Sequence, residues 1–373
     1  MSKETKIVIN ALQYKSNSSG IGIMMREWFG PFTEITKRDC EIVIPKNSPE
    51  FKCSKNTKVI ETPCTYEEGI KRIAFQSFGL GRKYCENAVL LTVDSKVPFV
   101  LPKSCKVIPI ITDLAVFRMS ETYQKSRVLL WKQQYKYLCK RAERFIAISE
   151  FTKKEMQDIL GVPAEKIDVI PCAASDKITM VTDEAVLAEV RKLYNLEKPF
   201  ILFVGSLNPR KNLVRLIQAF DKMKAETNLP HELVIAGGLG WKFDEAEALR
   251  NIKAKDAIRS IGYVDDEHKA ALYSAAEVFA FPTLYEGFGI PVIEAQQCGT
   301  AVLTSNISAL PEAAGDAAEY VNPYDTDDIA AGLIRLITDD EYRSTIVEKG
   351  FENAKRFSWK DSADKLGKVI ESI

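Results

Sequence analysis

The sequence predicts an α/β protein of two domains, each built on a parallel sheet covered by helices. Its length of 373 residues exceeds what one ordinary hydrophobic core holds, which predicts about two domains. Short apolar runs typical of buried strands alternate with helical segments along the whole chain, and this alternation favours parallel sheets. A composition of 46% hydrophobic and 27% charged residues lies in the globular range.

The first half of the chain carries most of the elements that can be assigned directly. Helices are predicted where residues 22–30 follow the opening strand and at residues 151–160, where Gly161-Val162-Pro163 ends the helix. Residues 173–198 carry a further helix and the crossing to the second domain. The predicted strands are residues 6–10, 88–93, 107–111, 144–148 and 168–171.

The second half contains a motif of two glutamates around a glycine-rich turn. A buried strand is predicted at residues 278–281, and Pro291 suits the first turn of a helix. Between them, Gly287 and Gly289 allow the backbone to approach a ligand closely, and the free N–H groups of a helix start bind anions. Glu286 and Glu294 therefore flank a predicted phosphate site, one before it and one about a helical turn inside.

A second motif lies upstream in the same half. The strand at residues 200–204 ends at Gly205, and Arg210 and Lys211 follow where the next helix is expected to begin. Adjacent cations at such a point suit phosphate oxygens. Solvated surface charge is the alternative, and the two-glutamate motif downstream favours the phosphate interpretation.

Taken together and in this order, these motifs resemble glycosyltransferase family 4, whose members have the GT-B fold and transfer a sugar from a nucleotide diphosphate with retention of configuration. The resemblance runs over roughly residues 199–325. The matching residues are Gly205, Arg210-Lys211-Asn212, Ala236-Gly237-Gly238, Ile261-Gly262-Tyr263-Val264, Leu284-Tyr285-Glu286-Gly287-Phe288-Gly289, Glu294-Ala295, Cys298-Gly299-Thr300 and Leu310-Pro311-Glu312.

The resemblance implies two Rossmann-like domains that face a cleft. Residues 1–175 would form the acceptor-binding domain, joined by a return helix at about 355–373, and residues 198–354 would bind the nucleotide sugar. It also implies catalytic roles for Arg210, Lys211, Glu286 and Asp113. The implied donor-binding residues are Gly20, Gly22, Gly205, Tyr263, Val264, Gly287, Phe288, Gly289, Ile290 and Glu294.

The resemblance also implies individual roles around a leaving diphosphate. Arg210 and Lys211 would neutralise charge on the β-phosphate, helped by amides near Phe288 and Gly289. Glu286 would hold hydroxyls of the donor sugar, and Glu294 those of the ribose. In the first domain the loop at residues 17–22 would bring Gly20 and Gly22 to the diphosphate, with an ordinary turn as the alternative.

The sequence departs from the family at one position. Many members carry His-Asp after a central strand of the first domain, whereas this chain has Thr112-Asp113. Asp113 could bind the acceptor or sugar hydroxyls, or could simply cap the segment that follows. His231 and His268 lie in the second domain and are expected at the surface, so no histidine base is predicted.

No metal and no cofactor are expected, because fixed cations would do the work of Mg²⁺. Asp325-Thr326-Asp327 precedes a helix and is interpreted as a cap. The eight cysteines contain no Cys-x2-Cys pair, and the chain shows neither a signal-peptide core nor a membrane span. These features predict a cytoplasmic protein with reduced thiols. A membrane-bound acceptor could bring this protein to the inner face of the cell membrane.

Charge is divided unevenly along the chain. Residues 1–180 hold 29 basic and 20 acidic residues (+9), which leaves 22 basic and 31 acidic residues (−9) for the remainder. An anionic partner of the first domain is therefore expected. No nucleic-acid motif is present, so we favour a lipid-diphosphate acceptor or weak contact with an anionic membrane.

Residues 66–84 are one segment that could make this contact, since they mix cations with aliphatic and aromatic side chains. Ile70, Ile73, Ala74, Ser77 and Phe78 can share one helical face, and the ordinary expectation is that the domain core buries them. Membrane contact is the alternative. The basic, aromatic run at residues 125–144 could widen the same face.

The activity predicted is transfer of a hexose from a nucleotide diphosphate sugar to a saccharide or a lipid-linked saccharide during surface-polysaccharide synthesis. GDP-mannose is the preferred donor, with dTDP-rhamnose and UDP-hexoses as alternatives. Two other functions stay open: a noncatalytic GT-B partner protein, suggested by Thr112, and a nucleotide-sugar epimerase of the same fold.

Overall fold

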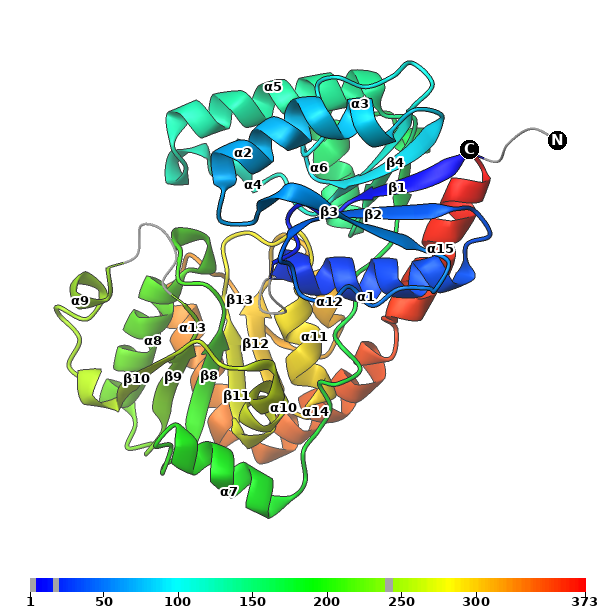
Figure 1. Ribbon diagram of the computed structural model, residues 1–373. Helices are drawn as coiled ribbons and strands as arrows, with labels where there is room; N and C mark the ends of the chain where they lie inside the picture. Colours follow the sequence, from blue (N-terminus) through cyan, green and yellow to red (C-terminus); the bar gives the residue numbers. More distant parts are fainter. Residues whose placement is uncertain (1–4, 16–19, 239–243) are drawn as a thin grey trace. The chain divides into compact units, whose positions relative to one another are not determined.

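A computed structural model describes residues 5–15, 20–238 and 244–373 of the chain. The chain divides into two compact units, one formed by residues 1–172 and 358–373 and the other by residues 173–357. Each unit contains one parallel sheet with helices packed on it (Figure 1).

The first unit has a seven-stranded sheet in the order β3-β2-β1-β4-β5-β6-β7, and every pairing in it is parallel. Its strands are β1 (Lys6–Asn10), β2 (Cys40–Lys46), β3 (Lys58–Thr65), β4 (Ala88–Val93), β5 (Lys106–Ile111), β6 (Phe145–Ala147) and β7 (Ile167–Val169). Its helices are α1 (Gly20–Ile35), α2 (Gly69–Ala74), the π-helical turn η1 (Phe75–Gly79), α3 (Leu80–Tyr84), α4 (Ala115–Arg118), α5 (Lys125–Arg141), α6 (Glu150–Leu160) and α15 (Trp359–Glu371).

The C-terminal helix α15 belongs to the first unit although it follows the whole second unit in sequence. It packs along α1, where the indole of Trp28 donates a hydrogen bond to the carbonyl of Ser362 at 3.1 Å. The rings of Trp28 and Trp359 lie 6.2 Å apart, and the Ser362 hydroxyl donates to Pro171 O at 2.7 Å. These contacts hold α15 against α1 and against the segment that follows β7.

The second unit has a six-stranded parallel sheet in the order β10-β9-β8-β11-β12-β13. Its strands are β8 (Phe200–Val204), β9 (Glu232–Ala236), β10 (Ile258–Gly262), β11 (Val278–Phe281), β12 (Ala301–Ser305) and β13 (Glu319–Val321). Its helices are α7 (Glu184–Leu193), α8 (Leu213–Glu226), α9 (Glu245–Ala248), α10 (Asp266–Ala275), α11 (Ile290–Gln297), α12 (Leu310–Ala314), α13 (Thr326–Thr338) and α14 (Asp340–Ala354).

The predicted fold class is confirmed: both units are α/β, with doubly wound parallel sheets. The strands predicted in the first half all occur: residues 6–10 and 88–93 have the predicted ends, and the ends of the other three differ by at most two residues. The sequence analysis missed β2 and β3, which lie at one edge of the first sheet. Only Thr62 and Cys64 are buried in β3, so it lacks the apolar run that marks a central strand.

One predicted helical face is wrong. In the continuous helix from α2 through η1 to α3, Ile70 is 88% exposed, Ile73 and Phe78 are each 54% exposed, and Ala74 is also exposed. Ser77 alone of the five residues is buried, as expected. The core-facing side is made by Gln76, Ser77, Leu80 and Gly81 instead. A Cβ on Gly81 would lie 2.0 Å from the carbonyl oxygen of Val100, so the helix backbone packs directly on that loop.

Within the described residues, no helix combines the length and the apolar character needed to cross a bilayer.

Candidate functional site

The central strands of the second unit place its predicted site. β8 and β11 are neighbours in the sheet, while the next strand in sequence after β8, β9, lies on the other side of β8. At such a reversal of strand order the loops leaving the carboxyl ends diverge, and ligands of α/β proteins bind there. The loop after β8 carries Arg210 and Lys211, and the loop after β11 carries Glu286.

These two loops meet in a buried ion cluster. Glu286 accepts a hydrogen bond from Lys211 Nζ at 2.9 Å on one oxygen and from Arg210 Nη1 at 3.0 Å on the other. The side chains of Lys211 and Glu286 are each 10% exposed and that of Arg210 is 17% exposed. Sequence reasoning assigned the cations and the carboxylate to different parts of a donor, whereas the structure joins them directly.

The cluster carries a net charge of +1 because two cations surround one carboxylate. Burial alone would raise the pKa of Glu286, but Arg210 and Lys211 together outweigh it and hold that pKa below its usual value. The Lys211 ammonium also lies 4.5 Å from the centre of the Phe281 ring. Glu286 therefore stays ionised and fixes both cations beside it.

Backbone hydrogen bonds hold the two loops in register. Asn208 caps a short 3₁₀ turn at Pro209–Lys211, and the carbonyl of Arg210 accepts from Leu284 N at 2.8 Å. Asn212 follows in the left-handed region at φ 58°, and its amide donates to the carbonyls of Pro282 and Pro323 at 2.9 and 2.7 Å. The cations thus lie in a tight turn ahead of α8 rather than at its first residue.

The glycine-rich turn predicted before α11 is present. Gly289 has φ 135°, and a Cβ there would come within 3.0 Å of Leu310 and 3.2 Å of Ala313. α11 begins at Ile290, with Pro291 in its first turn. Phe288 is buried edge-on against Phe357, with ring centres 5.4 Å apart. This packing fixes the amides that open the helix.

Glu294 lies inside α11 and is only 7% exposed. The buried hydroxyl of Tyr273 donates a 2.9 Å hydrogen bond to its carboxylate. Burial raises the pKa of Glu294, although the nearby Lys269 ammonium and the Tyr273 hydrogen bond oppose that shift. Tyr273 and Lys269 were not identified from the sequence; their spacing of four residues on α10, which puts them on one helix face, was the available signal.

Three more predicted donor residues, Gly205, Tyr263 and Val264, follow the carboxyl ends of β8 and β10, the two strands on either side of β9. Gly205 donates from its amide to Ala236 O at 2.9 Å, and a Cβ on Gly237 would lie 1.9 Å from Gly205 O, so no side chain fits there. Tyr263, just after β10, is 50% exposed, whereas Val264 is buried. Tyr263 therefore exposes its ring to solvent at the carboxyl ends of the strands, where Gly205 also lies.

The first unit has a different group at the corresponding reversal of its strand order. Asp94 follows β4 in the left-handed region, at φ 53°, and one oxygen of its carboxylate accepts from both the amide and the hydroxyl of Thr112, at 2.8 and 2.7 Å. Burial, reinforced by the neighbouring Asp113, raises the pKa of Asp94 to about 6. Asp113 accepts from Ala115 N at 3.0 Å, which is the capping role weighed above. Asp94 was not predicted.

Gly20 and Gly22, predicted in a loop, lie in the first turn of α1. Residues 17–19 of that predicted loop lie outside the described part of the chain. The expectation that His231 is a surface residue is wrong: it is 4% exposed, and its Nε2 lies 2.8 Å from a Glu277 oxygen. His268 is partly exposed in α10, as predicted for that helix.

The capping interpretation of Asp325 is confirmed, since its side chain accepts from the amides of Asp327 and Asp328 at the start of α13. Across residues 5–15, 20–238 and 244–373, no group of three or more His, Cys, Asp or Glu side chains could hold a metal ion.

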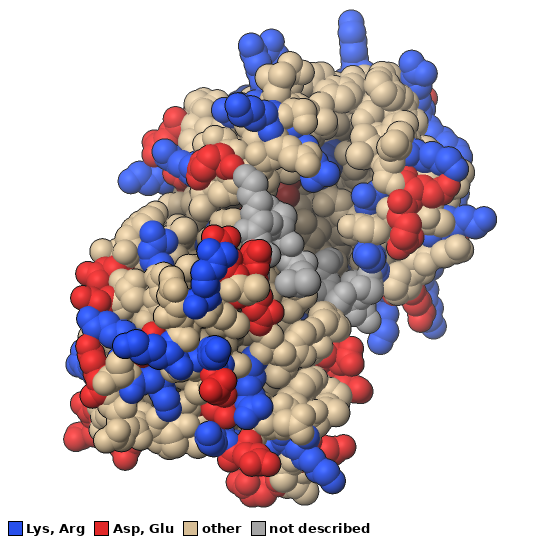
Figure 2. All heavy atoms as spheres, turned by 90° about the vertical axis from the view of Figure 1, so that its left-hand side faces the viewer, with Lys and Arg blue, Asp and Glu red and all other residues tan. Residues whose placement is uncertain are grey.

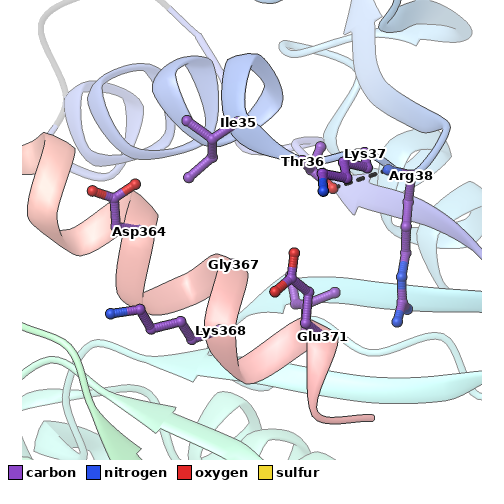
Figure 3. A pocket seen from close by; sticks show the side chains of 9 residues that line it. Ile35, Thr36, Lys37, Arg38, Asp364, Gly367, Lys368 and Glu371 are labelled. Carbon is purple, nitrogen blue, oxygen red and sulfur yellow. Dashed lines mark hydrogen bonds between the residues drawn. The ribbon is translucent and has the colours of Figure 1, made fainter.

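A pocket of roughly 400 Å³ occurs elsewhere in the first unit, where the end of α1 meets α15 (Figure 3). Its polar lining mixes both signs of charge, with Lys37, Arg38 and Lys368 against Asp364 and Glu371. None of the predicted site residues lines it, and it has no convergent set of like charges that would select a ligand.

Comparison with known proteins supports the resemblance seen in the sequence. Residues 188–353 match the family of glycosyl transferases group 1, and residues 112–176 match Glycosyltransferase Family 4. The O-antigen chain mannosyltransferase B of Escherichia coli is 32% identical over 250 residues, which span 67% of this chain and 66% of that protein. The chain belongs to glycosyltransferase family 4.

Two more distant similarities were also found. The serotype-specific mannosyltransferase WbdA of Escherichia coli is 28% identical over 231 residues, which span 60% of this chain but only 28% of WbdA. The structure of a sucrose-phosphate synthase from Thermosynechococcus elongatus superposes with a TM-score of 0.76 at 20% identity, over 99% of this chain and 98% of that one. That likeness, at low identity, concerns the GT-B fold.

Proposed function

We propose that this protein is a retaining glycosyltransferase that moves a hexose, with mannose from GDP-mannose as our first choice, to a saccharide or lipid-linked saccharide acceptor. The observation that carries the proposal is the Arg210–Glu286–Lys211 cluster with its net positive charge, at the strand reversal of the second unit. Mannosyltransferase relatives support the choice of donor sugar.

In this proposal the cluster acts on the diphosphate that leaves the sugar. The bond between the anomeric carbon and the phosphate oxygen breaks while the acceptor hydroxyl forms the new bond on the same face, and a leaving phosphate oxygen takes the proton of that hydroxyl. Arg210 and Lys211 stabilise the negative charge that develops, and amides at Phe288 and Gly289 share that task. Glu286 aligns the cations and binds donor hydroxyls.

Nucleoside recognition is assigned to the other carboxylate of the motif. Glu294, held by Tyr273 through a 2.9 Å hydrogen bond, accepts from the ribose hydroxyls. Tyr263 contributes its exposed ring near the same sheet edge. For the first unit we assign Gly20 and Gly22 to the donor and Asp113 to an acceptor hydroxyl. A lipid-linked acceptor would bring the protein to the inner face of the membrane.

The deciding experiment is turnover of purified protein with GDP-mannose, dTDP-rhamnose and UDP-glucose, each with and without a saccharide acceptor. Release of GDP that depends on acceptor supports the proposal, and anomeric analysis of the product tests retention. Interconversion of the donor without acceptor would identify an epimerase. Absence of turnover with every donor, together with no thermal stabilisation by any nucleoside diphosphate, would favour a noncatalytic partner protein.

A further inference from the structure

We propose that the first unit carries a docking face for an anionic lipid bilayer, formed by the helix α2–η1–α3, the loop residue Phe99 and the outer side of α5. We call this surface the basic apolar face. The inference deepens the proposed function, because it rests on a lipid-linked acceptor as the reason for such a surface, and it concerns residues that take no part in the ion cluster.

Exposed apolar side chains are concentrated on this face. Eight large hydrophobic residues of the first unit are exposed among those the structure describes, and six of them belong to it. The two outside it are Ile35 and Val59. The six on it are Ile70, Ile73, Phe78, Phe99, Leu129 and Leu130. An exposed apolar patch of this kind on a soluble domain marks a contact surface.

Ring contacts join the separate elements into one surface. Phe78 of η1 and Phe99 have ring centres 6.3 Å apart, and Phe99 and Tyr137 of α5 have ring centres 5.9 Å apart. The amide of Phe99 donates to Ser77 O at 2.9 Å, and the Tyr137 hydroxyl donates to Phe99 O at 3.1 Å. Figure 1 shows α5 beside α2 and α3 in agreement with these contacts. The aromatic residues are therefore fixed by the backbone, although Phe78 remains half exposed.

A π-helical turn at Phe75–Gly79 separates Ile70 and Ile73 from Gly81. A π turn adds one residue to a helical turn and so rotates everything that follows it about the helix axis. Ser77 and Gly81 face the core, whereas Phe78 points outward beyond Ile70 and Ile73. Gln76 and Leu80 are also buried, so the inner side of the helix packs on the core, and that packing does not explain why Ile70, Ile73 and Phe78 lie on its outer side.

Charge identifies the partner. Residues 69–84 contain four Lys or Arg and residues 125–141 contain six, and neither segment contains any Asp or Glu. Arg82, Lys83, Lys132, Lys136 and Lys140 are exposed. Lys71 does form an exposed pair with Glu68, just before the helix. In Figure 2, Lys and Arg side chains project from the upper end of the molecule, where Figure 1 places α3 and α5.

Apolar and aromatic side chains among cations match the interface of an anionic bilayer, where the rings enter the headgroup region and each cation adds attraction. An acidic protein would satisfy the cations but would leave the isoleucines in water. A second copy of this chain would place its own ten Lys and Arg residues against these ten, and like charges repel. An anionic bilayer accommodates both the apolar side chains and the cations.

Flotation of the full-length protein with vesicles tests the inference. We expect binding to vesicles of phosphatidylglycerol and phosphatidylcholine in equal parts, much weaker binding to phosphatidylcholine alone, and loss of binding at high salt. The variant Lys132→Gln/Lys136→Gln/Lys140→Gln should reduce partitioning on the order of a hundredfold, at roughly fivefold for each lysine. Ile70→Ser/Ile73→Ser/Phe78→Ser should reduce it at least roughly tenfold, because the lost apolar area contributes to insertion.

A matched control is Val186→Ser/Leu193→Ser on α7, which removes exposed apolar residues of the second unit and should leave vesicle binding unchanged. Equal binding to both vesicle types, or wild-type binding by both face variants, would overturn the inference. So would a dimer in sedimentation that the Ile70, Ile73 and Phe78 changes dissociate. Turnover with a water-soluble saccharide acceptor separates the two proposals: turnover without vesicle binding overturns only this one, and vesicle binding without turnover overturns only the transferase activity.

Discussion

The two units use the same central strand order but place opposite chemistry where that order reverses. In the second unit, Glu286 is surrounded by Arg210 and Lys211, and its pKa is lowered. In the first unit, Asp94 has hydroxyl and amide partners in Thr112, lies near another carboxylate, and has a pKa raised to about 6. One sheet thus presents a fixed positive site, and the other presents carboxylates.

The difference suits the two substrates of the proposed reaction. A diphosphate needs cations that are already in place, because reorganising them during the reaction would raise the barrier. An acceptor saccharide offers neutral hydroxyls, and carboxylates bind those well. Asp94 also has a left-handed backbone conformation, which residues other than glycine rarely adopt, and such strain is concentrated at functional sites.

The largest effect is expected when the positive site is broken. Lys211→Ala removes a buried cation from the leaving diphosphate and should lower kcat/KM about a hundredfold, or ~3 kcal/mol. Initial rates over a range of donor concentrations measure it. Lys222→Ala is the matched control, since Lys222 pairs with Asp327 on an exposed side of α8 and should retain full activity. A Lys211 variant within twofold of wild type would remove this lysine from the mechanism.

Glu286→Gln tests whether activity depends on the negative charge of Glu286 or only on the size of its side chain. The amide keeps the size of Glu286 but no longer balances Arg210 and Lys211, which lie 3.0 and 2.9 Å from it. We expect kcat to fall on the order of a hundredfold, with a smaller change in KM, because misaligned cations affect the transition state most. An unchanged kcat would show that Glu286 contributes only to folding.

Asp94→Asn tests the carboxylate of the first unit through its effect on the free energy of unfolding. The folded pKa of about 6 lies above the usual 3.8, so the folded state binds this proton more tightly than the unfolded state does. Stability from this group is therefore full below about pH 4 and falls as pH rises towards 6; above that the penalty is at most about 3 kcal/mol.

Asparagine does not titrate there and can still accept from Thr112. The variant should be more stable than wild type at pH 8, with the advantage shrinking at pH 4, as denaturant midpoints at the two pH values would measure. A constant difference between the two proteins across this range would contradict the raised pKa.

Much of the second unit's site could be predicted from sequence because its chemistry is local. The turn around Gly289, Pro291 at the helix start and the adjacent cations are each visible within ten residues. The sequence could not show that Glu286 pairs with Arg210 and Lys211, which lie 76 and 75 positions earlier in the chain. That pairing depends on β8 and β11 being neighbours in the sheet.

The first unit was less predictable for a related reason. Asp94 and Thr112 are 18 residues apart and meet because β4 and β5 pair in parallel, so neither residue alone signals the contact. The helix at residues 69–84 has the right apolar periodicity, but periodicity does not say which side faces the core. Here the side that packs on the core carries Ser77, Leu80 and Gly81, and the side with Ile70, Ile73 and Phe78 is exposed.

A smaller effect is expected at Glu294, the carboxylate that we assign to the nucleoside. Glu294→Ala should weaken GDP binding about tenfold and change kcat little, because ribose contacts act equally in the ground and transition states. Calorimetric titration with GDP measures the affinity, and steady-state rates give kcat. Tyr273→Phe, which removes the 2.9 Å hydrogen bond to Glu294, should produce the same pattern to a lesser degree. A fall in kcat at unchanged affinity would instead place Glu294 in the chemical step.

The smallest effect is expected at Thr112, the residue that stands where many family members have histidine. Its hydroxyl donates 2.7 Å to Asp94 and stabilises the ionised carboxylate. Thr112→Val keeps the backbone donor but loses this bond, so it should lower stability by about 1 kcal/mol at pH 8 and less at pH 4, where Asp94 is protonated. Thr112→Ser keeps the hydroxyl and serves as the control. If valine costs the same at both pH values, the hydroxyl does not act on the charge of Asp94, and the contrast between the two strand reversals would rest on burial alone.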